Sequence, residues 1–531
     1  MKARLWALCF CMLFALPVFG QDDAQQCARD DINPDLAISY CTRAIQSGQL
    51  TGQGLAATTY NRGNAYMDLK EWDKAIADYN AALEITKDAS TYNNRGMCFR
   101  EKGELDKAIA DYDESLRIDP QHESAFNNRG NAWRDKGELD KAIADYDEAI
   151  RIDQSNAKAH RNRGLCYDDK GDYDKALADE TEAIRLDPKF AAAYNSRGLI
   201  YLKQVKYDLA LADFNKTLEL NPSSEDGYNN RGLSWLRQGE YDKAIADFDA
   251  AIKVDPEFAI AYDNRGDTWK AKEDYDRAAA DYDQAIRFKP NKAVYYVDRG
   301  DALRLKGALA KAVADYTQAV TLSPDYSWAF TIRGSTYAEM GEWEKAFADF
   351  DKGVQLSPKS VAALFSRGRA RFSRGEYKQA IEDLDAAHEL NPAYAYTSLW
   401  LAMARMRSGG SDFGPRLDEQ SKSLSKNDWP FPVVKLYTGE MTAEQLLAAA
   451  KDPDDKKERT QACEAQFYLG EWQLAHGRKL SALEHMKQAR GMCPKNFIEY
   501  EGALAELKHA AGPAAQATLK PVAAKPSAGG R

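Results

Sequence analysis

The chain has 531 residues, of which 29% are charged and 44% hydrophobic, with only 18 prolines. This composition favours helical or repeated architecture over separate β-rich domains. A net charge of -10, from 72 basic and 82 acidic residues, disfavours proteins whose main task is to neutralise nucleic-acid or membrane phosphates. Six His and eight Cys provide few ligands for a metal centre, so we expect no metal and no cofactor.

The first twenty residues have the features of an export signal. A short basic segment precedes an apolar stretch from Leu5 to Phe19, and Val18-Phe19-Gly20 places small residues where a signal peptidase cleaves. The apolar stretch is shorter than the roughly 20 residues that a transmembrane helix needs. We therefore predict a cleaved signal peptide at residues 1–20, no membrane span, and a mature protein located in the bacterial periplasm.

An Arg-Gly pair recurs with one step of 33 residues and eight of 34. Its arginines are Arg62, Arg95, Arg129, Arg163, Arg197, Arg231, Arg265, Arg299, Arg333 and Arg367. We number each repeat so that this Gly is position 8, which places Ala at position 20 of all ten repeats and aromatic or apolar residues at positions 4, 11 and 24 of most. Spacings of three and four residues indicate helices, and a fixed period indicates stacked hairpins. Each repeat is therefore predicted to be a pair of helices that approach closely at positions 8 and 20.

This pattern resembles the tetratricopeptide repeat (TPR) family. The resemblance implies an all-α, right-handed superhelical solenoid of about twelve helix hairpins. We expect a capping hairpin at residues 21–55 and ten tandem repeats at residues 56–392.

The C-terminal part departs from the repeat. Residues 393–462 are expected to form an irregular helical segment, with an extended crossing from Trp429 to Pro432 and a short helix near Thr442 to Ala450. Residues 463–508 are expected to hold a further repeat and a capping helix. The composition of residues 509–531 predicts a disordered tail.

Six cysteines remain after the signal is removed. Positions that face each other across a hairpin add up to about 31 or 32, which pairs Cys463 at position 1 with Cys493 at position 31. Ala37-Ile38 and Ala44-Ile45 repeat the pattern of a second helix, which places Cys41 at position 24, and Cys27 is expected on the helix before it. We predict these two disulfides, one at each end of the solenoid, and buried packing roles for the other two cysteines, both at position 10.

Every Arg at position 7 is accompanied by Asp at position 23, as in Arg129 and Asp145. The two positions can meet across the hairpin. We interpret them as structural ion pairs, with a row of ligand-binding arginines as the alternative.

The resemblance also implies that positions 2, 5, 6, 9, 12 and 13 line a concave groove, where an Asn at position 6 contacts the backbone of a bound peptide. The candidate peptide-binding residues are Asn61, Asn94, Asn128, Asn162, Asn230 and Asn264. A side-chain amide offers one acceptor and two donors to an extended peptide. Since the row is interrupted from Ser196 onward, we expect the strongest groove over the first three or four repeats. A purely local structural role of these asparagines is the alternative.

The fourth repeat is unusual because His160 and Glu180 replace its aromatic residues. We interpret them as a polar patch whose members compensate each other, and acid-base catalysis is the rival interpretation. The sequence has no phosphate-binding loop, no His-Glu-x-x-His and no Gly-x-Ser-x-Gly motif. We therefore predict no catalytic and no metal-binding residues.

The most favoured function is an exported, non-enzymatic scaffold that binds partner proteins or peptides in its concave groove, with no nucleic acid among its partners. The C-terminal part is similar to envelope adaptor lipoproteins in Trp429-Pro430, Tyr437-Thr438-Gly439 and the stretch from Cys463 to Gly470, although the chain lacks their lipid-bearing cysteine. The alternatives are an enzyme or sugar-binding component of polysaccharide handling and a structural part of an outer-membrane assembly.

Overall fold

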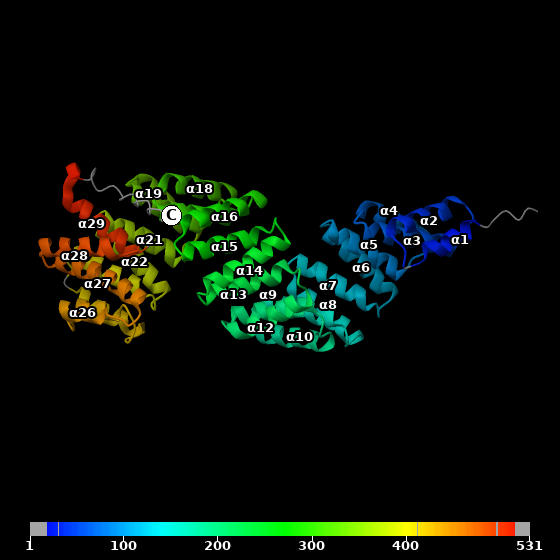
Figure 1. The fold of residues 1–531 in the computed structure, drawn as a ribbon, viewed down its shortest axis with the longest axis horizontal. Coiled ribbons are helices and arrows are strands. Elements are labelled where there is room, and N and C mark those ends of the chain that lie inside the picture. The colour runs from blue at the N-terminus through cyan, green and yellow to red at the C-terminus, as the bar shows by residue number, and fades with distance from the viewer. Residues whose placement is uncertain (1–18, 30, 411, 495–496, 516–531) are drawn as a thin grey trace, which may run out of the picture. The chain divides into compact units, whose positions relative to one another are not determined.

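The computed structural model describes residues 19–29, 31–410, 412–494 and 497–515. Within these ranges all regular secondary structure is helical, and successive helices pack as antiparallel pairs (Figure 1). The predicted signal peptide, up to residue 18, and the chain after residue 515 lie outside the described residues. Two compact units divide the chain after Gln238, and each is considered by itself.

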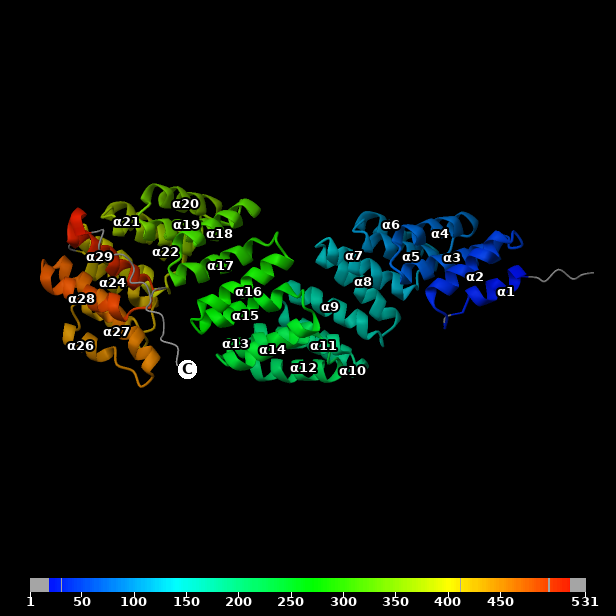
Figure 2. The same ribbon diagram turned by 45° about the horizontal axis from the view of Figure 1, so that its top comes forward.

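The first unit begins with a short hairpin of α1 (Phe19–Cys27) and α2 (Pro34–Gln46) and continues with five complete repeats (Figure 2). The repeat helices are α3 (Gly52–Asp68), α4 (Trp72–Ile85), α5 (Ala89–Glu101), α6 (Leu105–Ile118), α7 (Glu123–Asp135), α8 (Leu139–Ile152), α9 (Ala157–Asp169), α10 (Tyr173–Leu186), α11 (Ala191–Lys203), α12 (Tyr207–Leu220) and α13 (Glu225–Arg237).

The second unit continues the same pattern to the tenth repeat. Its repeat helices are α14 (Tyr241–Val254), α15 (Ala259–Ala271), α16 (Tyr275–Phe288), α17 (Ala293–Lys306), α18 (Leu309–Leu322), α19 (Ser327–Met340), α20 (Trp343–Leu356), α21 (Val361–Ser373) and α22 (Tyr377–Leu390).

The C-terminal helices surround the largest hydrophobic core of the molecule, in which Trp400 and Phe467 are fully buried and stack at 5.6 Å. They are α23 (Ala395–Arg407), α24 (Phe413–Gln420), the 3₁₀ turn η1 (Ser421–Ser423), α25 (Phe431–Thr438), α26 (Ala443–Ala449), α27 (Asp455–Ala475), α28 (Lys479–Met492) and α29 (Ile498–Ala515). The expected short helix is confirmed as α26, whose first turn is fixed by a capping box between Thr442 and Gln445.

Two expectations about this region are wrong. Phe431 and Pro432 begin helix α25 instead of an extended crossing, because Pro is well accommodated in the first turn of a helix. Helix α29 continues past Lys508 to Ala515, where a disordered tail was expected from residue 509; residues 516–531 lie outside the described residues.

Position 24 is aromatic in eight of the ten repeats, and its ring packs on the glycine at position 8; Glu180 and Leu384 take its place in the fourth and tenth. The Ala at position 20 is fully buried in all ten repeats, and the side chain at position 24 is at most 1% exposed. A Cβ atom added to Gly130 would lie 2.7 Å from Cε1 of Tyr146, and the same close approach recurs at Gly63, Gly198 and Gly300. The ring fills the space that the missing side chain leaves, which explains the tiny residue at position 8.

Two disulfides join the pairs that the sequence predicts. Cys27 is bonded to Cys41 and Cys463 to Cys493, each with Cα atoms 4.9 Å apart. Cys98 and Cys166 are free and fully buried. Burial raises the pKa of Cys98 to about 12 and of Cys166 to about 11, so neither thiol is ionised at neutral pH. Their predicted packing role is confirmed.

We predict that Gly130→Ala destabilises the third repeat by about 1 to 3 kcal/mol, because the new methyl group overpacks against Tyr146. Gly164→Ala is the matched control, since Glu180 replaces the ring in its repeat and the nearest atom to the new Cβ is 3.2 Å away. Both variants gain the same helix propensity. Urea denaturation should show a larger loss for Gly130→Ala; equal effects would contradict this account of the joint.

Candidate functional site

The arginine at position 7 connects three helices. In the third repeat, Arg129 donates from Nε to Asp145 Oδ2 at 2.8 Å and from Nη2 to Asp145 Oδ1 at 2.6 Å, which ties α7 to α8. Its third nitrogen, Nη1, donates to Asp113 Oδ1 of the preceding repeat at 2.6 Å. The Asp145 side chain is only 8% exposed. A guanidinium that makes a fork to one carboxylate has strong, directional hydrogen bonds.

The same fork recurs along the chain. It joins Arg62 to Asp78, Arg95 to Asp111, Arg163 to Asp179, Arg197 to Asp213, Arg265 to Asp281, Arg299 to Asp315, Arg333 to Asp349 and Arg367 to Asp383. The hydrogen bonds with Asp111 raise the pKa of the Arg95 guanidinium against the opposing effect of burial. The structural interpretation of these arginines is confirmed, and a row of ligand-binding arginines is not supported because their donors are already engaged.

The predicted asparagine row forms hydrogen bonds between repeats. Asn128 Nδ2 donates to Asn93 Oδ1 at 3.0 Å, and Asn162 Nδ2 donates to Asn127 Oδ1 at 3.0 Å. In each case the acceptor is position 5 of the preceding repeat. The sequence analysis did not predict this hydrogen bond, although Asn93 and Asn127 at position 5 could have indicated it.

Other members of the row differ in their surroundings. Asn94 Nδ2 donates to Tyr60 Oη at 2.9 Å and to Asn64 Oδ1 at 3.0 Å. Asn230 donates to Asn195 at 3.1 Å and is only 9% exposed. Asn61 and Asn264 are half-buried at the same position of the first and seventh repeats. The half-buried members of the first four repeats are therefore the ones a ligand can reach.

The fourth repeat contains a buried carboxyl group. Glu180 is fully buried, and neither of its oxygens has a hydrogen-bond partner. Burial raises its pKa to about 9, opposed in part by the charge of Arg161. His160 Nδ1 lies 3.3 Å from Oδ1 of Asp179. The expectation that His160 and Glu180 compensate each other is wrong, because His160 contacts the fork carboxylate instead.

The positions expected to line the concave side are acidic in the second unit where the first unit has amides. Asp263 and Asp298, at positions 5 and 6 of successive repeats, have pKa values raised by burial and by neighbouring carboxylates, to about 8 and about 7. Tyr282 donates to Asp267 and Tyr316 to Asp301, each at 2.7 Å. Lys270 lies among these carboxylates, 2.8 Å from Asp267 and 3.8 Å from Asp298. Sequence reasoning treated these aspartates only as interruptions of the asparagine row.

Helix α29 covers the end of this concave side. Glu501 accepts a hydrogen bond from Arg304 at 3.2 Å and another from Arg369, which lie on α17 and α21. A Cβ atom on Gly502 would lie 2.6 Å from the Phe467 ring, so α29 packs directly on the C-terminal core. The groove positions of Arg304 and Arg369 are therefore occupied by the chain itself.

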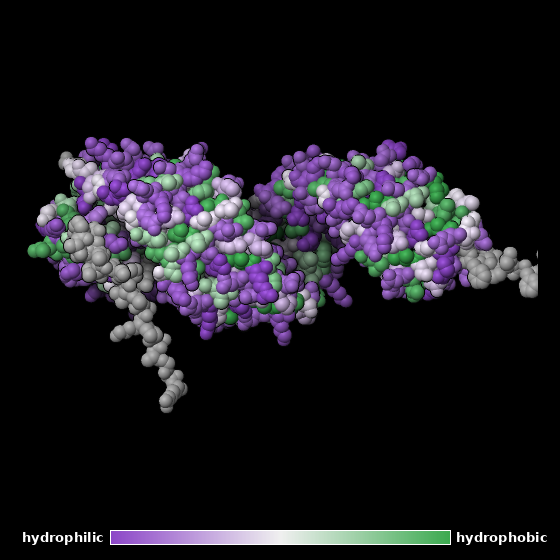
Figure 3. Space-filling model, turned by 90° about the horizontal axis from the view of Figure 1, so that it is seen from above, coloured by the Kyte–Doolittle hydropathy of each residue, from purple (hydrophilic) through white to green (hydrophobic). Residues whose placement is uncertain are grey.

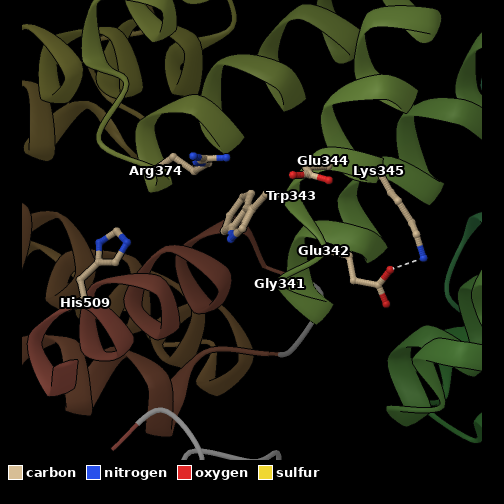
Figure 4. Close-up of a pocket in the computed structure, with 7 residues that line it drawn as sticks. All are labelled: Gly341, Glu342, Trp343, Glu344, Lys345, Arg374 and His509. Carbon is tan, nitrogen blue, oxygen red and sulfur yellow. Dashed lines mark ion pairs between the residues drawn. The ribbon is translucent and has the colours of Figure 1, made fainter. Parts of the chain in front are cut away.

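A shallow pocket of about 640 Å³ lies at the hairpin turn of the ninth repeat. Figure 4 shows His509 of α29 facing Trp343 across it. Arg374 lies 6.0 Å from the centre of the Trp343 ring. None of the predicted site residues lines this pocket. Among the described residues, no His, Cys, Asp and Glu side chains group as metal ligands, and no helix is both long and apolar enough to cross a bilayer.

Models of tetratricopeptide repeats match most of the repeat array. Those described as "Tetratricopeptide repeat" match residues 54–121, 157–190, 191–224, 225–258, 259–292 and 333–395, and one described as "TPR repeat" matches residues 130–168 and 300–341.

Solved structures with similar folds include a tetratricopeptide repeat protein from Parabacteroides merdae, which is 25% identical, covers 47% of this chain and 98% of its own, and has a TM-score of 0.40. YrrB, described as "a TPR protein with an unusual peptide-binding site", is 27% identical over 34% of this chain and 92% of its own, with a TM-score of 0.28. The Cut9-Hcn1 structure is 13% identical over 93% of this chain and 95% of its own, with a TM-score of 0.43.

We predict that Glu180 makes the protein less stable as the pH rises. Between its ordinary pKa of 4.5 and its folded value of about 9, the unfolded chain ionises Glu180 while the folded chain keeps the proton. Folding then takes up a proton, so stability falls through this window. Glu180→Gln is neutral at every pH and should lose this dependence.

The measurement is urea denaturation at about pH 5 and about pH 8, where linkage predicts that the advantage of Glu180→Gln over the parent grows with pH. Glu84→Gln, at an exposed position of α4, serves as the control. An advantage that is the same at both pH values would show that Glu180 is not held protonated by the fold.

Proposed function

Because the chain belongs to the tetratricopeptide repeat family, whose members generally mediate protein–protein interactions and bind peptides, we propose that it is an exported, non-enzymatic scaffold of the bacterial cell envelope. It holds partner proteins or peptides on its concave surface. Its C-terminal similarity to envelope adaptor lipoproteins suggests that these partners include cell-wall hydrolases or proteases.

The observation that supports peptide binding is the amide row of the first unit. Asn94, Asn128 and Asn162 are half-buried and follow each other at the same position of successive helices α5, α7 and α9. The bonds to the preceding repeat hold each carboxamide in place. An amide nitrogen has two N–H groups, so Asn128 and Asn162 each keep a donor for a peptide carbonyl. Fixed amides lose little rotamer entropy when a ligand binds.

Location in an oxidising compartment is supported by the cysteines. Both disulfides lie in terminal hairpins, α1 with α2 and α27 with α28, where a repeat lacks one of its two neighbours. Disulfides of this kind persist in the periplasm and are rare in the cytosol. This agrees with the export signal expected from the sequence.

The fourth repeat gives the enzymatic alternative no support. Glu180 is fully enclosed and cannot reach a substrate, and His160 is only 8% exposed. A general acid or base has to lie within hydrogen-bond distance of the reacting group.

We predict that Asn128→Ala combined with Asn162→Ala reduces the partners captured from an envelope extract by about tenfold, as loss of roughly 1.4 kcal/mol of binding energy would do. The control is Asn291→Ala, which changes an exposed asparagine in the turn between α16 and α17. Circular dichroism should confirm that the double variant is folded, since each side chain also joins two repeats.

Quantitative mass spectrometry of the captured proteins is the measurement. Unchanged capture by the folded double variant would contradict binding at the asparagine row.

A further inference from the structure

An exposed apolar stripe runs across the first helices of three successive repeats in the second unit. Ile260, Val294 and Trp328 occupy position 2 of three successive repeats and are 41%, 42% and 44% exposed. Position 2 of the first five repeats holds small or charged residues instead: Ala57, Ser90, Ser124, Lys158 and Ala192. Figure 3 shows apolar patches among the hydrophilic surface of this unit. A periodic apolar stripe that remains exposed indicates an interaction surface.

Carboxylates lie on the same helix faces as this stripe. Asp263 and Asp267 follow Ile260 by three and seven residues on α15, and Asp298 and Asp301 follow Val294 by four and seven on α17. Residues with these spacings share one face of a helix. The stripe is therefore bordered by a row of acidic side chains.

The cations near these carboxylates do not balance them. Lys270 is close to Asp267 and Asp298, while Arg304 is bound to Glu339 and to Glu501 of α29. Asp263 Oδ1 is buried and has no hydrogen-bond partner. Four acidic side chains thus share one lysine, and part of their hydrogen-bonding capacity is unused. Because burial raises the pKa of Asp263 to about 8 and that of Asp298 to about 7, a cation placed beside them would favour their ionised forms. Positively charged groups of a ligand would supply what is missing.

Helix α29 limits the extent of the surface. Through Glu501 it occupies the groove at Arg304 and Arg369, which belong to the eighth and tenth repeats. The open part lies beside it, from α15 to the N-terminal end of α19, where Trp328 is found. Helix α29 therefore covers the basic residues Arg304 and Arg369 through its Glu501, whereas the acidic and apolar residues beside them remain uncovered.

We infer that this open surface binds a basic segment of a partner protein, in which Lys or Arg side chains alternate with apolar ones. The apolar side chains cover Ile260, Val294 and Trp328, and the basic ones reach the aspartates. Trp328 adds a ring over which a cation can lie. The inference rests on the proposed scaffold function and names the class of partner for the second unit.

The test measures binding of a fluorescent synthetic peptide of alternating lysine and leucine to the full mature chain by fluorescence anisotropy. A peptide of alternating glutamate and leucine is the charge control. We expect the lysine peptide to bind and the glutamate peptide to bind at least about tenfold more weakly, with affinity for the lysine peptide falling as salt rises.

Variants locate the site. Asp263→Asn with Asp298→Asn, and separately Trp328→Ala, should each weaken binding of the lysine peptide by about tenfold. Matched controls are Asp325→Asn in an exposed turn and Leu480→Ala at a side chain that is 88% exposed on α28. Equal binding of both peptides, or affinities that these variants leave unchanged, would overturn the inference.

The chain's own basic end is the competing occupant. Residues 516–531 contain Lys520, Lys525 and Arg531 and no acidic residue. If a chain ending at residue 515 bound the lysine peptide much more tightly than the full chain, that segment would be the occupant, and assignment to a partner would be wrong.

Failure of this inference is distinguishable from failure of the proposed function. Asn128→Ala with Asn162→Ala should leave the affinity for the lysine peptide unchanged. If the lysine peptide does not bind while the asparagine variant loses its captured partners, only the inference about the second unit is overturned.

Discussion

The structure depends on the buried fork between the arginine at position 7 and the aspartate at position 23. One guanidinium, such as that of Arg129, joins both helices of its own hairpin and the second helix of the preceding one. A buried carboxylate is costly unless it is paired and hydrogen-bonded, so Asp145 requires this partner. Because the interaction repeats with the period of the sequence, it determines both the closure of each hairpin and its stacking on the one before.

This arrangement leaves the concave side free to differ between repeats. The ring on glycine and the fork occupy the space between helices, whereas positions 2, 5 and 6 take no part in either. The first unit uses these positions for amides, and the second unit uses them for apolar and acidic residues. The same glycine–ring contact and Arg–Asp fork can therefore support two surfaces of different chemistry. This is general where function depends on sites placed on a common fold.

The repeat period, the hairpins, the fork and both disulfides could be predicted because each follows from residue spacing. In every repeat the aspartate lies 16 residues after the arginine, as Asp145 does after Arg129, and the antiparallel hairpin brings the two side chains together. The hydrogen-bond partner of Asn128 could not be predicted, because it depends on how one repeat is rotated against the next. The position of α29 could not be predicted from the sequence either, because the contact between Glu501 and Arg304 joins residues that are 197 positions apart. The prediction of an extended crossing from Trp429 to Pro432 was wrong, because Pro is compatible both with an extended chain and with the start of a helix.

The most direct test of the central role of the fork is a double-mutant cycle of Arg129→Ala and Asp145→Ala, read by native-state hydrogen exchange of α7 and α8. This method reports local opening in a repeat protein that need not unfold in one step. If the fork joins the helices, Asp145→Ala should relieve most of the loss caused by Arg129→Ala, with a coupling energy of about 2 to 3 kcal/mol. Losses that simply add, within about 0.5 kcal/mol, would contradict the account.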